Sequence, residues 1–243
     1  MMKAPIFALL VVALLPGVTA AELSPEIRPV PRISAMGGVL PDGATMPAPR
    51  ITRLPPKRRP ATLPRTRWER VAGSDLWTRS ALSALKAHGR PLITMVPSDI
   101  SGFCPAYEQQ PPEKRAEFWV GFLSALARHE STYRPRAVGG GGKWHGLLQI
   151  LPSTARLYGC RARSGEALLN GPANLSCAIR IMAKTVPRDG KIGASGKGGV
   201  AADWGPMVYR KKRADIAAYT RRQSYCRPLA SIRPRQRPAR NDR

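Results

Sequence analysis

Histidine and acidic residues are scarce in this sequence of 243 residues. It contains three histidines and 15 acidic residues against 40 lysines and arginines, which gives a formal net charge of +25. The four cysteines include no closely spaced pair of the kind that binds structural zinc. His129-Glu130 would begin a zinc-protease motif only if a second histidine stood at Tyr133. We therefore expect no metal and no other cofactor.

Apolar runs long enough to span a bilayer are missing as well. The N-terminal run, residues 6–15, lies between Pro5 and Pro16 and is too short to cross a membrane. A lysine precedes it and small residues follow it at 18–21, as in a secretory signal peptide. No cysteine stands near the expected cleavage site to carry a lipid. We predict a signal peptide over residues 1–21 and a periplasmic protein that does not span the membrane.

Proline and arginine dominate residues 22–66, where apolar periodicity is absent. Because proline removes backbone donors and such a segment buries little apolar surface, we predict an extended, disordered arm. The arm acts as a spacer or, alternatively, as a tether or partner-binding segment. Residues 228–243 are basic, and we predict a disordered tail there. Between arm and tail we expect one domain, residues 67–227, in a monomeric protein.

Much of the positive charge is assigned to the arm and the tail. A field of this sign holds a protein near anionic polymers. The tail contains no nucleic-acid-binding fold or base-reading motif, and export argues against a genomic role. We therefore expect no specific nucleic-acid partner and interpret the charge as retention at the cell envelope.

Three segments of the domain have the pattern of helices. Residues 68–88 fit an amphipathic helix that ends before Gly89, with Leu76 among its apolar residues. Residues 118–126 are apolar throughout and follow two prolines, which predicts a buried helix. A third helix is expected between Pro172 and Pro187. Residues 92–97 are expected to form an edge strand or a packed loop.

Glu130 lies at the end of the expected buried helix. Burial and the negative end of the helix dipole both disfavour a charged carboxylate, so we predict a raised pKa for this residue. A carboxylic acid that stays protonated near neutral pH is what cleavage of a glycosidic bond requires. Taken alone, a glutamate in this position is more often a solvated carboxylate at a helix end.

The neighbouring residues favour the first interpretation, because two motifs in order resemble the catalytic domain of the soluble lytic transglycosylase (SLT) family, in the lysozyme superfamily. The residues that carry the resemblance are Glu130, Ser131, Tyr133, Pro135 and Ala137, then Gly146-Leu147-Leu148-Gln149-Ile150, Pro152, Thr154 and Ala155. The resemblance implies a mainly α, lysozyme-like (goose-type) domain with a groove for peptidoglycan glycan strands.

The resemblance also implies residue roles. Glu130 would be the single general acid/base that cleaves the bond between N-acetylmuramic acid and N-acetylglucosamine, with formation of a 1,6-anhydro ring. Ser131 would support it, and Asn174 fits the place of a family asparagine. The other residues implied to contact the sugars are Tyr133, Gly146, Leu147, Gln149 and Ile150.

The last third of the chain departs from the family pattern, which usually has Ala-Tyr-Asn followed closely by Gly. Here residues 201–206 read Ala-Ala-Asp-Trp-Gly-Pro. We expect Asp203 and Trp204 to line the groove, with Tyr209 or Tyr219 as alternatives. Loss of the motif leaves a second hypothesis open, a non-catalytic peptidoglycan-binding scaffold in an envelope-spanning secretion or conjugation machine.

A lysozyme-type hydrolase is the other alternative, and it needs a second carboxylate that faces the first. Between Glu130 and the basic tail the acidic residues are Glu166, Asp189, Asp203 and Asp215. Asp203 is the candidate among them. A transglycosylase needs no such partner, because one glutamate can act first as acid and then as base.

The four cysteines of an exported protein are expected to form disulfides. Three pairings are compatible with the sequence. We prefer Cys160–Cys177, which closes a small loop, together with Cys104–Cys226, which joins the two ends of the domain.

Overall fold

The computed structural model describes residues 63–228; the predicted signal peptide, residues 22–62 of the predicted arm and residues 229–243 of the tail lie outside this range. Helices dominate the described residues, as predicted, and none of the helices there is long and apolar enough to cross a membrane. The elements are α1 (Ser74–Lys86), α2 (Arg90–Thr94), the 3-10 helices η1 (Ile100–Gly102) and η2 (Tyr107–Gln109), α3 (Pro112–Glu130), β1 (Val138–Gly139), β2 (Trp144–His145), α4 (Pro152–Leu157), α5 (Gly165–Leu168), α6 (Gly171–Asp189), η3 (Gly199–Ala202), α7 (Gly205–Val208), α8 (Arg210–Arg221) and η4 (Ser224–Cys226).

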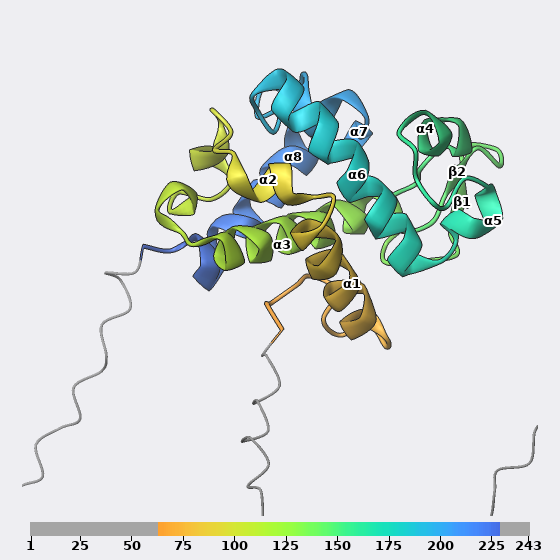
Figure 1. The fold of residues 1–243 in the computed structure, drawn as a ribbon, viewed down its shortest axis with the longest axis horizontal. Coiled ribbons are helices and arrows are strands. Elements are labelled where there is room, and N and C mark those ends of the chain that lie inside the picture. Colours follow the sequence, from red (N-terminus) through yellow and green to blue (C-terminus); the bar gives the residue numbers. More distant parts are fainter. Residues whose placement is uncertain (1–62, 229–243) are drawn as a thin grey trace, which may run out of the picture. The chain divides into compact units, whose positions relative to one another are not determined.

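Helix α3 is the central helix of the described residues. Pro112 in its first turn favours initiation, because the missing N–H of proline would have no partner there in any case. Every residue from Phe118 to Ala127 is buried, as expected of a helix that other elements enclose. Helices α1, α2 and α8 pack against it, and Figure 1 shows it running through the middle of the ribbon. The packing fixes the position of its last residue, Glu130.

Gly121 allows the C-terminal segment to pack closely on α3. A Cβ atom at this position would collide with the hydroxyl group of Tyr225, which lies in η4 and is fully buried. Any larger residue would therefore push η4 away from the centre of the fold.

Helix α1 is shorter than predicted. Residues 68–73 form turns, and Gly73, with φ of +77°, directly precedes the first helical residue, Ser74. Trp68 still belongs to the core, because its ring packs edge-on against Trp77 with the centroids 5.8 Å apart. Leu76, predicted to lie on the apolar face, is 59% exposed. The sequence pattern therefore located the helix but not its start or all of its buried face.

Two further boundaries differ from the prediction because of prolines. The run expected as an edge strand or packed loop begins as α2, since Pro91 in the first turn favours a helix. Helix α6 continues past Pro187 to Asp189, where a left-handed Gly190 ends it and donates its N–H to the Pro187 carbonyl. Pro187 has no N–H to donate to the carbonyl four residues earlier, and the helix ends only two residues after it.

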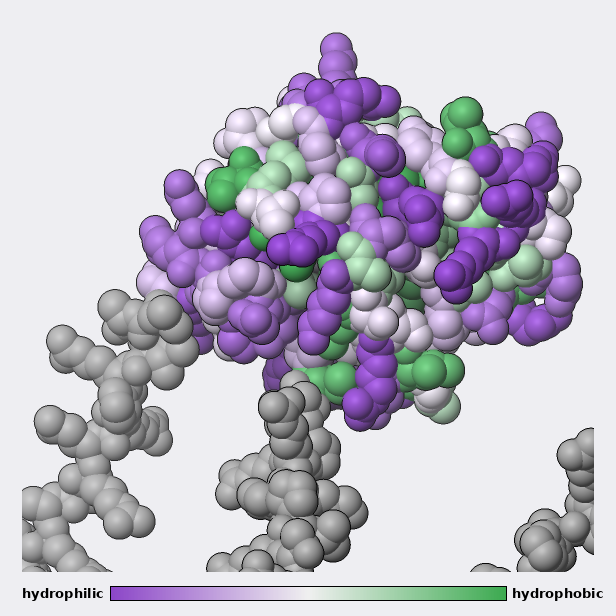
Figure 2. Space-filling view, in the orientation of Figure 1, coloured by the Kyte–Doolittle hydropathy of each residue, from purple (hydrophilic) through white to green (hydrophobic). Residues whose placement is uncertain are grey.

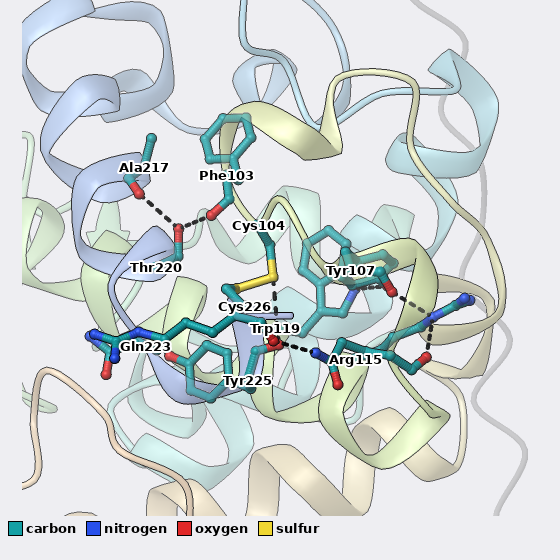
Figure 3. The surroundings of a disulfide bond; sticks show 12 residues. Phe103, Cys104, Tyr107, Arg115, Trp119, Ala217, Thr220, Gln223, Tyr225 and Cys226 are labelled. Carbon is teal, nitrogen blue, oxygen red and sulfur yellow. Dashed lines mark hydrogen bonds between the residues drawn. A yellow bond between two sulfur atoms is a disulfide. The ribbon is translucent and has the colours of Figure 1, made fainter. Parts of the chain in front are cut away.

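Two disulfides join the cysteines in the pairing that the sequence analysis preferred, Cys104–Cys226 and Cys160–Cys177. Around the first, Thr220 donates a hydrogen bond to the Phe103 carbonyl at 2.7 Å, which ties α8 to the same segment (Figure 3). The disulfides fit an extracytoplasmic location, because thiols are kept reduced in the cytosol.

The described residues carry a large positive charge of their own, in addition to that of the arm and the tail. Residues 63–228 contain 27 of the 40 lysines and arginines and 11 of the 15 acidic residues, so they carry +16 of the net +25. Figure 2 shows hydrophilic residues over most of the visible face, with hydrophobic residues in small separate patches. Contacts with anionic partners are therefore to be expected on the domain itself.

Candidate active site

Glu130 is the last residue of α3 and lies half-buried at the wall of a cleft. Burial raises the pKa of its carboxyl group to about 7, and the ammonium group of Lys212 acts in the opposite direction. Ser131, the next residue, is buried and closes the helix by donating its backbone N–H to the Ala127 carbonyl at 3.0 Å. A carboxylic acid with a pKa near neutrality can both give and take a proton.

The backbone is strained on both sides of the cleft. Thr132 and Tyr133, directly after the end of α3, have φ of +52° and +62°, and Gln149 has φ of +46°. Among residues 63–228 these are the only non-glycine residues with positive φ, and such conformations cost about 1–2 kcal/mol each. Strain of this kind persists where the surrounding structure enforces it, often at functional sites.

The cleft has a volume of about 370 Å³. Its walls come from the end of α3, the β1–β2 hairpin, the segment around α7, and α8. The residues that line it are His129, Glu130, Gly139, Gly140, Trp144, Gln149, Asp203, Trp204, Gly205, Pro206, Tyr209 and Lys212. A smaller cavity of about 50 Å³ shares Trp144, Gln149, Asp203 and Trp204 with it and extends to Ile150.

The hairpin brings Trp144 to the edge of the cleft. Val138 pairs with His145 and Gly139 with Trp144, and a turn containing three left-handed glycines connects the strands. A Cβ atom on Gly140 would collide with the Trp144 ring, so glycine is required for the ring to lie over this turn. Trp144 is 43% exposed, which leaves a ring surface available to a sugar.

A buried amide holds the turn at residues 145–150. Asn174, on α6, accepts a hydrogen bond from the Leu148 N–H at 2.9 Å and donates to the carbonyls of His145 (2.9 Å) and Leu168 (3.0 Å). Gly146 has φ of +80°, and a Cβ there would collide with the side chain of Asn174. The side-chain amide of Gln149 donates to the Gly146 carbonyl at 2.9 Å and to the carbonyl of Ala137, just before β1, at 3.1 Å. The turn is therefore rigid, and its position relative to α6 is fixed.

The sequence and structure were compared with known proteins. Residues 109–202 match the family model of the transglycosylase SLT domain. A solved structure of a Bd0314 DslA mutant is 30% identical, with a TM-score of 0.60, and the match covers 66% of this chain and 96% of that chain. For the wild-type form 2 of DslA the identity and TM-score are the same, and the match covers 67% and 98%. The comparison with curated proteins gave no match.

The chain belongs to the SLT transglycosylase family. This confirms the family resemblance and the lysozyme-like fold predicted from the sequence. Members of the SLT family are lytic transglycosylases, so peptidoglycan is the substrate class that the family implies.

The residues of the two SLT motifs divide between the cleft and its support. Glu130 and Gln149 line the cleft and Ile150 borders the adjoining cavity. Leu147 is fully buried in the hydrophobic core, and Gly146 is a buried residue of the turn itself. Tyr133 lines a separate hollow with residues 134–138, and its buried hydroxyl group has no hydrogen-bond partner among the described residues. Position in an SLT motif therefore does not by itself indicate contact with substrate.

The segment that departs from the SLT pattern still contributes to the cleft. Asp203 and Trp204 line it, and Trp204 donates its indole N–H to the Leu148 carbonyl at 3.0 Å. Of the two alternative tyrosines, Tyr209 lines the cleft and is 63% exposed. Tyr219 lies instead against Arg67, whose guanidinium carbon is 5.3 Å from the centroid of the Tyr219 ring. Tyr209 is thus the tyrosine that shares a cleft with Glu130.

Asp203 has a raised pKa, mainly because of burial, and Arg188 acts in the opposite direction. Glu130 and Asp203 are therefore alike in this respect, because burial raises the pKa of each carboxyl group and a nearby cationic side chain lowers it.

Sequence reasoning missed Lys212 and the network behind His129. His129 shares a hydrogen bond with Asp215 at 2.8 Å, and Arg67 binds the same carboxylate, with one contact at 3.0 Å. Arg67 and His129 lower the pKa of Asp215 to about 2. The hydrogen bond between His129 and Asp215 joins α3 to α8 behind the cleft, and it helps to hold Lys212, on α8, near Glu130. The basic run at residues 210–213 was visible in the sequence, but charge alone did not indicate which residue faces the cleft.

Proposed function

We propose that this chain is an exported peptidoglycan lytic transglycosylase in which Glu130 is the single general acid/base. The bond cleaved is the β-1,4 bond between N-acetylmuramic acid and N-acetylglucosamine, and the product ends in 1,6-anhydro-N-acetylmuramic acid. In this proposal residues 67–227 form the catalytic domain, residues 1–21 direct export to the periplasm, and the basic arm and tail keep the enzyme near the wall.

The observation that carries this proposal is the raised pKa of Glu130 in a cleft that can hold sugars. At a pKa of about 7, a substantial share of the carboxyl groups is protonated at neutral pH and can act as acid. After protonation of the leaving group, the same residue is a carboxylate strong enough to act as base. Membership in the SLT family supplies the independent support for the substrate class.

The proposed reaction consumes no water. The Glu130 carboxyl group gives its proton to the bridging oxygen as the bond from that oxygen to C1 of the muramic acid breaks. The acetamido group of the same sugar stabilises the positive charge that develops at C1. The Glu130 carboxylate then takes the proton of the C6 hydroxyl, whose oxygen forms the new bond to C1. Glu130 is protonated again at the end of the cycle.

The walls of the cleft suggest roles for the remaining side chains. Trp144 offers a ring face for stacking on a sugar, Trp204 closes the wall from a buried position, and Tyr209 supplies a hydroxyl group that can bind a polar group of the substrate. We propose Gln149 chiefly as a support of the cleft wall, because its side-chain N–H groups bind backbone carbonyls. Its amide oxygen is left to accept a hydrogen bond from a sugar.

Hydrolysis of the lysozyme type is the second candidate, and Asp203 is the observation that favours it. Asp203 lines the same cleft as Glu130 and could activate a water or stabilise the cation at C1. An Asp203→Asn variant distinguishes the two mechanisms. A transglycosylase in which Glu130 acts alone should retain most of its activity in this variant, whereas a hydrolase that uses Asp203 should lose its activity.

The deciding experiment is mass spectrometry of the fragments that the mature protein releases from purified peptidoglycan, with a Glu130→Gln variant in parallel. We expect fragments that are lighter than hydrolysis products by one water. The rate at which fragments are released should fall by about 10²–10⁴-fold in the variant. Reducing-end fragments that disappear in Asp203→Asn would establish hydrolysis instead. Wall binding without any release would establish the non-catalytic scaffold.

A further inference from the structure

A second groove lies between α1 and α6 and shares no lining residue with the cleft that contains Glu130. Its volume is about 530 Å³. Helix α1 contributes Ser80 and Ser83, helix α6 contributes Ser176 and Arg180, and the loop before α5 contributes Arg161. The rest of its lining is four alanines, His88, one proline, one asparagine and the two cysteines of a disulfide. The two helices pack together beneath it, and Figure 1 shows them as neighbours.

The two arginines of this groove lack partners in the protein. Neither Arg161 nor Arg180 forms a side-chain hydrogen bond or an ion pair anywhere in residues 63–228, whereas other arginines of the domain, such as Arg67, are paired. No acidic side chain lines the groove. Two guanidinium groups that face one hollow repel each other and favour an anion between them, because a carboxylate accepts two parallel hydrogen bonds from each guanidinium.

A disulfide fixes the two arginines relative to one another. Cys160 directly precedes Arg161, and Cys177 lies one helical turn before Arg180, so the Cys160–Cys177 bond joins the two segments that carry them. His88 donates a further hydrogen bond to the Ser176 carbonyl at 2.9 Å and joins the end of α1 to α6. The backbone segments that carry the two arginines are therefore held together before any ligand binds, which reduces part of the entropy lost on binding.

We propose that this groove is a second peptidoglycan-binding site, which takes the carboxylates of a stem peptide between Arg161 and Arg180. The inference rests on the proposed function only for the identity of the polymer. The lining suits such a peptide, since serine hydroxyl groups can bind its amides and the alanine surfaces fit its small side chains. The basic arm and tail of this chain are poor occupants, because their charge has the same sign as the groove.

The groove would hold the wall by its peptides while the cleft holds a glycan strand. Two contacts on one polymer raise the effective concentration of the glycan at the cleft, so the second site should lower KM on peptide-bearing wall material and leave kcat unchanged.

Calorimetric titration of the full chain tests the proposal. The probe is the free stem tetrapeptide, alanyl-γ-glutamyl-diaminopimelyl-alanine, added to the Glu130→Gln variant so that no glycan cleavage is involved. We expect binding that weakens about tenfold when Arg161→Gln and Arg180→Gln are introduced together, because each exchange removes charge-assisted bonds. The matched control is Arg221→Gln with Arg222→Gln, which removes the same charge from exposed positions of the α8 end. Thermal melting of each variant, single exchanges included, checks that the fold is retained.

Three results would overturn the proposal. Equal affinity of the groove and control variants would place the peptide elsewhere. Equal binding of a tetrapeptide with amidated carboxylates would exclude recognition by charge. Displacement by inorganic phosphate at concentrations equal to the peptide would mean a general anion site. Glycan cleavage is assayed separately on peptide-free strands, so a failure of the proposed enzyme activity is distinguishable from a failure of this site.

Discussion

Glu130 and Lys212 line the same cleft from α3 and α8, and they act on one proton in opposite directions. Burial favours the protonated form of Glu130, whereas the ammonium group favours its charged form. The pKa near neutrality is therefore a balance between desolvation and a nearby charge. A residue that must both donate and accept a proton benefits from such a balance.

Replacing Lys212 should shift the pH dependence of activity. In Lys212→Met the charged form of Glu130 loses its stabilising neighbour, so the pKa of Glu130 rises and the acid stays protonated to higher pH. We expect the alkaline limb of the plot of kcat/KM against pH to shift to higher pH. The control is Lys211→Met, since Lys211 is exposed and does not line the cleft. An unchanged limb in Lys212→Met would mean that this ammonium group does not act on Glu130.

Glu130 should also make the fold less stable as pH rises. Its pKa is about 7 in the folded protein against 4.5 for the free side chain, so the folded state binds the extra proton between these values. The penalty is absent below about pH 4.5 and fully present above about pH 7, where it is about 3 kcal/mol. Glu130→Gln should therefore raise the melting temperature at pH 8 and leave it nearly unchanged at pH 4. Equal effects at both pH values would contradict the raised pKa.

The sequence predicts the Glu130 end of the cleft better than its far wall. Glu130 was identifiable because an apolar run after two prolines predicts α3, and the residues that follow form a recognisable motif. Lys212 and Tyr209 enter the cleft from about 80 residues away in the chain. Their positions depend on how α8 packs on α3, which Arg67, His129 and Asp215 help to fix and which no local pattern contains.

The motif around Gly146 illustrates a second limit. Leu147 and Gln149 are two residues apart, yet one is in the core and the other lines the cleft. Both belong to a turn that Asn174 holds, so a family motif covers supporting and exposed residues alike. Helix boundaries were the weakest predictions for a related reason: Gly73 and Pro187 act through local backbone geometry that periodicity does not describe.

Asn174 should matter more for stability than its size suggests. In Asn174→Ala the buried Leu148 N–H and Leu168 carbonyl lose the partner that Asn174 provides, and the His145 carbonyl keeps only the Ile150 N–H. We expect a loss of about 2–4 kcal/mol in the free energy of unfolding, measured with urea. Asn170→Ala is the comparison, because Asn170 caps the same helix from an exposed position and should cost only about 1 kcal/mol. Equal losses would show that the turn does not depend on this amide.

The two disulfides close loops of very different length, so their effects on the free energy of unfolding can be compared. All four cysteines are buried, so replacing each pair by alanine removes similar contacts, but Cys104–Cys226 closes 122 residues and Cys160–Cys177 closes 17. If the cross-link acts on the entropy of the unfolded chain, loss of the long closure should cost roughly 1.5–2 kcal/mol more in urea unfolding than loss of the short one. A larger loss for the short closure would mean that Cys160–Cys177 acts mainly in the folded state. That result would fit its position between Arg161 and Arg180, where it holds the walls of the second groove.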